Sequence, residues 1–239
     1  MIVHTKAIII SALKYGEADL IVKAYTLSDG VKSYMLKGIL KSKKGKFKAS
    51  MFQVLTQLDI VANHRNQGKL EYLKEAKILE TYQTLHTHPI KTTMVMFLAE
   101  MLRNTIQEEE PNPHLYKYLE NTFQYLDHTS SIANFHLLFL LHLTKYLGFR
   151  PQSEKPEDEF FNLLDGVFQS FSTNDYCLEG EQVNLLKRLL GTDFDALNEI
   201  KLNQAARNNF LNMLLLYYEL HIEGFRKPKS LSVLNEIFS

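Results

Sequence analysis

The hydrophobic period of this chain changes once, near residue 82, and the change limits the folds open to it. Before that point, short β-branched segments such as residues 7–10 (Ala-Ile-Ile-Ile) alternate with turns such as residues 28–30 (Ser-Asp-Gly). This spacing is typical of strands. After Pro89, apolar residues recur every three or four positions, as in amphipathic helices. We predict an α+β protein with a strand-rich domain, residues 1–82, followed by an α-helical domain, residues 83–239.

Five strands are expected in the first domain. They are predicted at residues 7–10, 20–26, 31–40, 52–62 and 70–79. A small closed or partly closed barrel is the usual arrangement for so many short strands in about eighty residues, and the OB-fold is the commonest five-stranded solution. We therefore expect an N-terminal five-stranded OB-like β-barrel.

The second domain should be mostly helical, with one small β-hairpin insertion. Helices are predicted around residues 94–106, 115–126, 132–147, 181–190, 205–222 and 231–238. Within residues 152–179, two aromatic-rich segments flank an Asp-Gly pair, Asp165-Gly166, which is a strong hairpin signal.

Charge is divided unequally between the two parts of the chain. The whole sequence is formally neutral, with 27 Lys+Arg and 27 Asp+Glu. Residues 1–80 hold fourteen basic against seven acidic side chains, whereas residues 81–239 hold thirteen against twenty. This segregation favours a nucleic-acid-binding first domain, although solvated basic strand faces would give the same counts.

The densest positive charge is the lysine segment, residues 32–48, which contains seven lysines. Most of them fall in a predicted exposed loop between two strands, where flexible ammonium groups can reach phosphates at many geometries. Such contacts carry little sequence preference. Tyr25, Tyr34 and Phe47 lie beside the basic residues and could stack on bases, while for Tyr25 and Tyr34 packing in the barrel is an equal alternative. The candidate DNA-binding residues are Lys37, Lys41, Lys43, Lys44, Lys46, Lys48, Tyr34 and Arg65.

Several other classes of protein are disfavoured. No run of eighteen apolar residues exists, so we expect no membrane span, and the absence of a signal-peptide pattern favours a cytoplasmic protein. No phosphate-binding loop, nucleophile elbow or His-Glu-x-x-His motif is present, so we predict no enzyme activity. Cys177 is the one cysteine, which excludes an internal disulfide and a cysteine-based zinc site.

The acidic helical domain is either a scaffold or a docking surface for a partner. Four basic residues stand in otherwise acidic surroundings and could receive an acidic peptide whose end enters an apolar groove. These candidate docking residues are Lys91, Arg103, Lys145 and Arg150.

A series of short motifs resembles the bacterial recombination mediator RecO family. Their order and spacing are more specific than any one of them. The motifs are Ala7-Ile8-Ile9-Ile10, Tyr15-Gly16-Glu17-x-Asp19-Leu20-Ile21, Thr26-x-x-x-Gly30, Lys37-Gly38-Ile39, Glu75-Ala76-x-x-Leu79 and Leu147-Gly148-Phe149-Arg150-Pro151.

The resemblance implies an OB-fold, an α-helical domain and a non-enzymatic role in recombinational DNA repair. Members bind single- and double-stranded DNA, anneal complementary strands and, together with RecR, help to load RecA onto DNA covered by single-strand-binding protein. They dock the acidic C-terminal tail of that protein on the helical domain. A nucleoid-associated cytoplasmic protein is expected. Two alternatives from other classes are an RNA-binding or translation-associated OB protein and a protein-interaction scaffold.

The chain departs from many family members at residues 152–179. Those members carry a four-cysteine zinc module after the Leu-Gly-x-x-Pro signature, whereas this region holds Cys177 alone and the predicted hairpin. We therefore expect no zinc or other cofactor.

Overall fold

The computed structural model describes residues 1–41, 45–65, 70–107, 109–152 and 157–238. Contacts divide the chain into two compact units, Met1–His128 with Pro228–Ser230, and Thr129–Lys227 with Leu231–Ser239. The first unit joins the barrel to two helices, while the sequence-based boundary after residue 82 separates them. That boundary stays a prediction. The expectation of a mixed α and β protein is confirmed, and the two units are described separately below.

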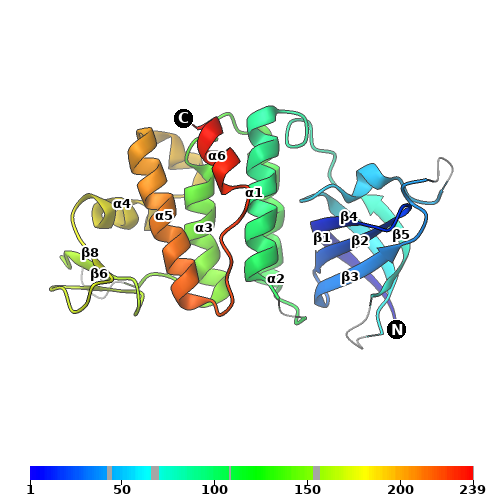
Figure 1. Cartoon of the computed structure of the whole chain (residues 1–239), viewed down its shortest axis with the longest axis horizontal. Coiled ribbons are helices and arrows are strands. Elements are labelled where there is room, and N and C mark those ends of the chain that lie inside the picture. The colour runs from blue at the N-terminus through cyan, green and yellow to red at the C-terminus, as the bar shows by residue number, and fades with distance from the viewer. Residues whose placement is uncertain (42–44, 66–69, 108, 153–156, 239) are drawn as a thin grey trace. The chain divides into compact units, whose positions relative to one another are not determined.

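The first unit contains a five-stranded antiparallel sheet (Figure 1). Its strand order, β3-β2-β1-β4-β5, places the first strand at the centre. The strands are β1 (Ile2–Tyr15), β2 (Asp19–Thr26), β3 (Gly30–Leu36), β4 (Gln57–Asn63) and β5 (Tyr72–Ile78).

The sheet closes on itself where β3 meets the start of β5. A parallel bridge joins Tyr34 to Glu71. The Met35 amide donates to the Glu71 carbonyl over 3.2 Å, and the Glu71 amide donates to the Ser33 carbonyl over 2.7 Å. Closure satisfies backbone groups that would otherwise form an open edge. The predicted five-stranded OB-like barrel is confirmed.

Strand β1 is much longer than the expected segment 7–10, because it pairs with two neighbours in succession. Its first half, Ile2–Ile8, pairs with β4, and its second half, Ala7–Tyr15, pairs with β2. An irregularity between Ile9 and Ser11 interrupts the second pairing, as a bulge does where a strand bends.

Both faces of the middle of β1 are buried. Ala7 and Ile9 belong to the barrel core, while Ile8 and Ile10 are also at most 1% exposed on the opposite face. Helix α1 (Pro89–Thr105) packs against β1. The continuous apolar run is therefore explained by a strand covered on one side by the barrel and on the other by helix.

The fourth strand begins five residues later than predicted. A 3₁₀ helix, η1 (Ala49–Phe52), occupies the expected strand start. Leu55 then adopts a left-handed conformation, with φ +64°, and its amide donates to the Ile9 carbonyl over 2.6 Å. A non-glycine residue in this conformation costs roughly 1–2 kcal/mol and cannot continue a strand. Pairing with β1 accordingly starts at Gln57.

Helix α2 (Pro113–His128) is attached to the barrel by polar and aromatic contacts. Tyr25 stacks on Tyr116 with ring centroids 6.2 Å apart, and its hydroxyl donates to the Asn112 carbonyl over 3.2 Å. The Lys6 ammonium lies 2.9 Å from the buried Glu120 carboxylate. These contacts explain why the first compact unit extends past the barrel to the end of α2.

The second unit is built around the apolar helix α3 (Phe135–Leu147). It packs against α4 (Glu181–Leu190), α5 (Gln204–His221) and the 3₁₀ helix η2 (Phe194–Glu199). Helix α3 ends at Leu147, as the sequence predicted, and Gly148 follows it in the left-handed conformation, φ +88°. The Tyr218 hydroxyl donates to the Leu140 carbonyl over 2.7 Å. The last helix of this unit is α6 (Leu231–Ile237).

The predicted hairpin is present and gains a third strand. β6 (Phe160–Asn162) pairs with β7 (Val167–Gln169) and with β8 (Cys177–Leu178). Gly166 turns the chain at φ +70°, and a Cβ atom there would lie 2.5 Å from the Tyr217 hydroxyl oxygen. Glycine is thus required for its conformation and for its small size.

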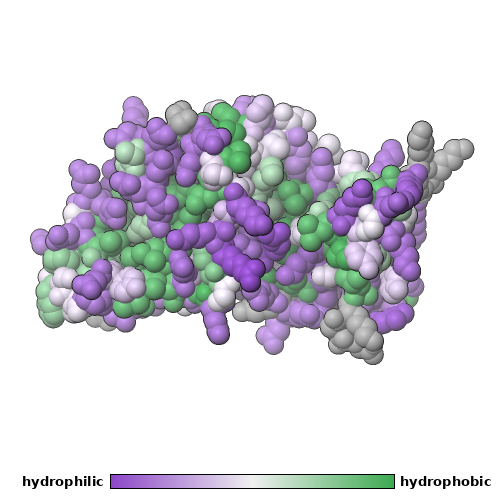
Figure 2. All heavy atoms as spheres, viewed as in Figure 1, coloured by the Kyte–Doolittle hydropathy of each residue, from purple (hydrophilic) through white to green (hydrophobic). Residues whose placement is uncertain are grey.

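No helix in the described part of the chain is long and apolar enough to cross a membrane. On the face drawn in Figure 2, hydrophilic side chains are spread among the hydrophobic ones.

Candidate nucleic-acid interface

The lysine segment leaves the barrel through a turn fixed to the connection between β1 and β2. Gly38 adopts φ +69°, and its amide donates to the Asp19 carboxylate over 2.7 Å. The Leu40 amide donates to the Ala18 carbonyl over 2.9 Å. These bonds anchor the backbone between Lys37 and Lys41, so the lysines project from a defined base.

The described lysines of the lysine segment that follow β3 are all exposed. Lys41 lies 2.6 Å from the Glu17 carboxylate, and Lys46 lies 3.9 Å from that of Glu75. Both pairs are more than half exposed, and pairs of this kind contribute only about 0–1 kcal/mol, so a phosphate can replace either carboxylate. The exposed candidates are Lys37, Lys41, Lys46 and Lys48, while Lys43 and Lys44 lie outside the described residues.

The far end of the lysine segment is anchored by aromatic packing. Phe47 meets Phe52 edge-on with ring centroids 5.9 Å apart, and Phe52 is 2% exposed in the barrel core. Phe47 itself packs against that core. It therefore serves as an anchor between Lys46 and Lys48, which favours packing over base stacking.

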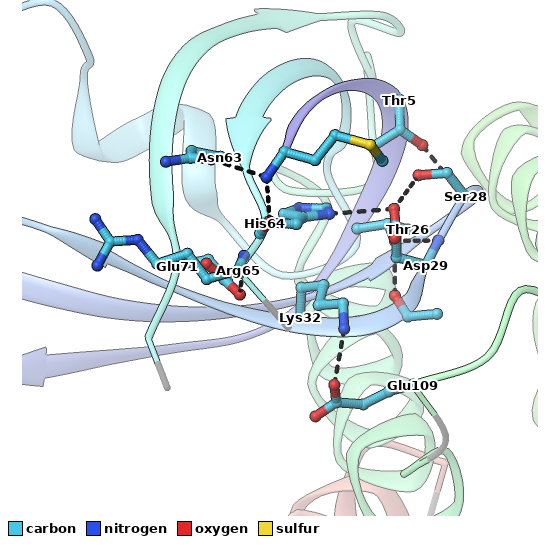
Figure 3. Close-up of polar contacts among 12 residues, drawn as sticks. Thr5, Thr26, Ser28, Asp29, Lys32, Asn63, His64, Arg65, Glu71 and Glu109 are labelled. Carbon is cyan, nitrogen blue, oxygen red and sulfur yellow. Dashed lines mark hydrogen bonds and ion pairs between the residues drawn. The ribbon is translucent and has the colours of Figure 1, made fainter. Parts of the chain in front are cut away.

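Tyr34 does not present its ring to a ligand, which corrects its place among the candidate DNA-binding residues. It is 2% exposed, and its hydroxyl lies 2.8 Å from Nε2 of His64. Nδ1 of His64 in turn lies 3.1 Å from the Asp29 carboxylate (Figure 3). Burial raises the pKa of the Tyr34 hydroxyl, so it stays neutral. Tyr25 is equally buried. For both tyrosines the packing alternative holds.

An exposed aromatic next to a cation is found elsewhere on the barrel. The Arg65 guanidinium carbon lies 5.5 Å from the centre of the Tyr72 ring, and Tyr72 is 45% exposed. Cation–π pairs and exposed rings are both used on single-stranded nucleic acids. Sequence reasoning selected Arg65 but missed Tyr72, which stood in the predicted strand 70–79 between Glu71 and Leu73.

Lys91 is a structural lysine, which corrects its place among the candidate docking residues. It is 5% exposed, and its ammonium donates to the Asp127 carbonyl over 2.7 Å and to the Thr84 hydroxyl over 2.9 Å. Burial lowers its pKa, partly offset by the Asp127 carboxylate. An ammonium enclosed in this way cannot receive a peptide.

The other docking candidates are accessible. Arg103 is 38% exposed and lies 3.9 Å from the Glu100 carboxylate. Lys145 and Arg150 are exposed at and beyond the end of α3. Arg103 belongs to the first unit, whereas Lys145 and Arg150 belong to the second.

The geometry defines a class of protein: an OB-like barrel with an exposed, anchored basic turn, followed in sequence by helices. Comparison with known proteins agrees with this class. Residues 1–82 match the family model "Recombination protein O N terminal", and residues 86–231 match "Recombination protein O C terminal".

Curated relatives match over the full length of both chains. The chain is 75% identical to the DNA repair protein RecO of Christiangramia forsetii, with 100% of each chain covered. It is 46% identical to the protein of that name from Flavobacterium psychrophilum and 33% identical to the one from Phocaeicola vulgatus, again with full coverage. The chain therefore belongs to the RecO family of DNA repair proteins.

Proposed function

We propose that the chain is a non-enzymatic DNA-binding mediator of recombinational repair. In this role it binds single- and double-stranded DNA, anneals complementary strands and, with RecR, helps to load RecA onto DNA covered by single-strand-binding protein. The observation that supports the proposal most directly is the lysine turn, which is the exposed and anchored part of the lysine segment that follows β3. Lys37, Lys41, Lys46 and Lys48 are exposed around backbone and aromatic anchors, on a fold suited to nucleic-acid strands.

Sequence-independent contacts suit annealing, because the protein must accept any pair of complementary strands. Lysines contribute charge without reading bases, and the affinity they provide falls steeply with salt. The acidic tail of single-strand-binding protein would dock on the helices, where Arg103, Lys145 and Arg150 are the accessible candidates.

An annealing assay tests this function. Complementary strands coated with single-strand-binding protein should anneal faster when the purified chain is added, and the gain should decline as salt rises. The same strands made of RNA, at matched length, serve as the comparison. An equal or greater effect on RNA would favour an RNA-binding protein, and no effect on either would contradict the proposal.

We also propose that the chain works without zinc. Its single cysteine, Cys177, lies in the small sheet at β8, where its sulfur accepts from the Gln169 side-chain amide over 3.2 Å. Structural zinc sites need four ligands that are usually cysteines or histidines. Metal analysis of protein purified without chelators should find no stoichiometric zinc; one zinc per chain would contradict this.

A further inference from the structure

A groove in the first unit lies between the barrel and the connection that follows α1. It has a volume of about 250 Å³ and is lined by Lys23 of β2, Lys32 of β3, Glu71 beside β5, and Glu109 of the connection. None of the residues that line the groove is among the exposed lysines Lys37, Lys41, Lys46 and Lys48 described above. Figure 3 shows the Lys32 and Glu109 side chains pointing toward one another.

Lys32 is the unusual member of the groove. Its side chain is 5% exposed, and its ammonium lies 2.7 Å from Oε2 of Glu109. Glu109 belongs to no helix or strand, and its side chain is 57% exposed. A buried ammonium requires an anion, because an uncompensated charge at such a site costs several kcal/mol. The exposed carboxylate has no comparable need for the lysine. The position beside Lys32 is thus an anion position that Glu109 can leave when another anion takes it.

A second cation, Lys23, lines the same groove, and Arg103 lies close enough to Lys23 to influence it. Burial lowers the pKa of Lys23; Arg103 lowers it further, and Glu109 raises it. Lys23 therefore lies within electrostatic range of both groups. Glu71 also lines the groove. Its carboxylate Oε1 accepts a hydrogen bond from the Arg65 amide over 2.9 Å. A backbone phosphodiester carries one negative charge shared by two oxygens, so it would suit these cations at least as well as one carboxylate.

We propose that this groove is a phosphate subsite for a DNA strand, and that Glu109 occupies it as a carboxylate substitute until a backbone phosphate displaces it. The subsite rests on the proposed DNA-binding function and extends it. Lys32 and Lys23 would hold the phosphate, and Arg103 would add positive potential. Part of the binding energy is spent on displacing Glu109, so the acidic connection weakens the binding of DNA.

Neutralising Glu109 should therefore strengthen binding. Glu109→Gln keeps the side-chain length and removes the competing charge, and we expect it to bind a fluorescein-labelled oligothymidylate about three- to tenfold more tightly in fluorescence anisotropy. The log–log salt slope should steepen by about 0.7, the increment for one added phosphate contact on a single strand.

Glu110→Gln is the matched control, because Glu110 is exposed and its loss changes the net charge equally. We expect its affinity to stay within about twofold of the wild type. Equal gains in both variants would overturn the proposal.

A second pair of measurements separates this subsite from general DNA binding. Adding Lys32→Gln to Glu109→Gln should abolish the gain, and a double variant that keeps the gain would overturn the proposal. Inorganic phosphate should raise the melting temperature of Glu109→Gln more than that of the wild type, whether or not DNA binds elsewhere. If the proposed function fails, the wild type will not bind DNA, while inorganic phosphate will still raise the melting temperature of Glu109→Gln.

Discussion

Replacing Lys41, Lys46 and Lys48 by alanine should weaken binding to single-stranded DNA by roughly ten- to a hundredfold at low salt, and should flatten its log–log salt slope by about 2. The slope follows from counterion release, because each phosphate contact on a single strand contributes about 0.7. All three lysines are exposed, and their described partners are exposed carboxylates that contribute little to stability. Folding should therefore be unchanged. Fluorescence anisotropy at several salt concentrations measures both quantities.

A matched variant distinguishes a site from bulk charge. Lys145, Lys201 and Lys227 are exposed in the second unit, and replacing them by alanine removes the same charge. We expect this control to lose less than about threefold in affinity, since exposed charges that make no phosphate contact release no counterions from the DNA. Equal losses in the two triple variants would show that DNA responds to the net charge of the chain. An unchanged slope in the first variant would remove the lysine turn from the interface.

The predicted strand 31–40 runs through Gly38, whereas β3 ends at Leu36 and Gly38 takes φ +69° in the turn that follows. The exposed basic loop itself could be predicted from sequence, because a run of lysines between two apolar strands is recognisable without knowledge of the fold. The same holds for Gly148 at the end of α3 and for the Asp165-Gly166 hairpin. Each of these features is decided within a few residues.

The roles of individual aromatic and basic side chains depend on partners far away in sequence. Tyr34 is buried by its contact with His64, thirty residues further on, and Lys91 by its bond to Asp127, thirty-six residues further on. A strand alternation shows which residues share a face, yet it does not show which face is later covered. For the same reason Tyr72 was overlooked, since its neighbour Arg65 approaches from the preceding loop.

The ion pair between Lys32 and Glu109 shows that the distribution of charge along the sequence is limited in the same way as a predictor of side-chain roles. Sequence places Lys32 within the lysine segment and Glu109 in an acidic stretch, and the two were assigned to opposite halves of a charge-divided chain. The fold brings them to 2.7 Å. Net charge per segment therefore predicts the sign of a surface, but it does not reveal which basic groups are already compensated by the chain itself.

Asp127→Ala should destabilise the first unit by about 3–5 kcal/mol, the largest effect on stability expected for one side chain here. The Asp127 carboxylate is 3% exposed and accepts from the backbone amides of Gln83, Thr84 and Leu85 at 2.9, 2.8 and 2.7 Å. These amides lie between β5 and α1, so the carboxylate fixes the path from barrel to helix. Alanine would leave the donors buried and unpaired. Urea unfolding measures the loss, with Asp175→Ala as the exposed control, expected within about 0.5 kcal/mol of the wild type.

The charge of Asp127 gives this prediction a signature in pH. Burial alone would raise the pKa of the carboxyl, but the hydrogen bonds from the three amides outweigh it, and the net pKa is below the ordinary value. A lowered folded pKa means that the stabilisation is complete above the unfolded pKa of about 3.9 and is lost as pH falls through the folded pKa. Asp127→Asn keeps one acceptor oxygen without the titrating charge. The wild type should therefore exceed Asp127→Asn in stability at pH 7, and the difference should shrink as the pH falls below about 4. A difference that stays constant from neutral to acid pH would show that the amides depend on the shape of the side chain and not on its charge.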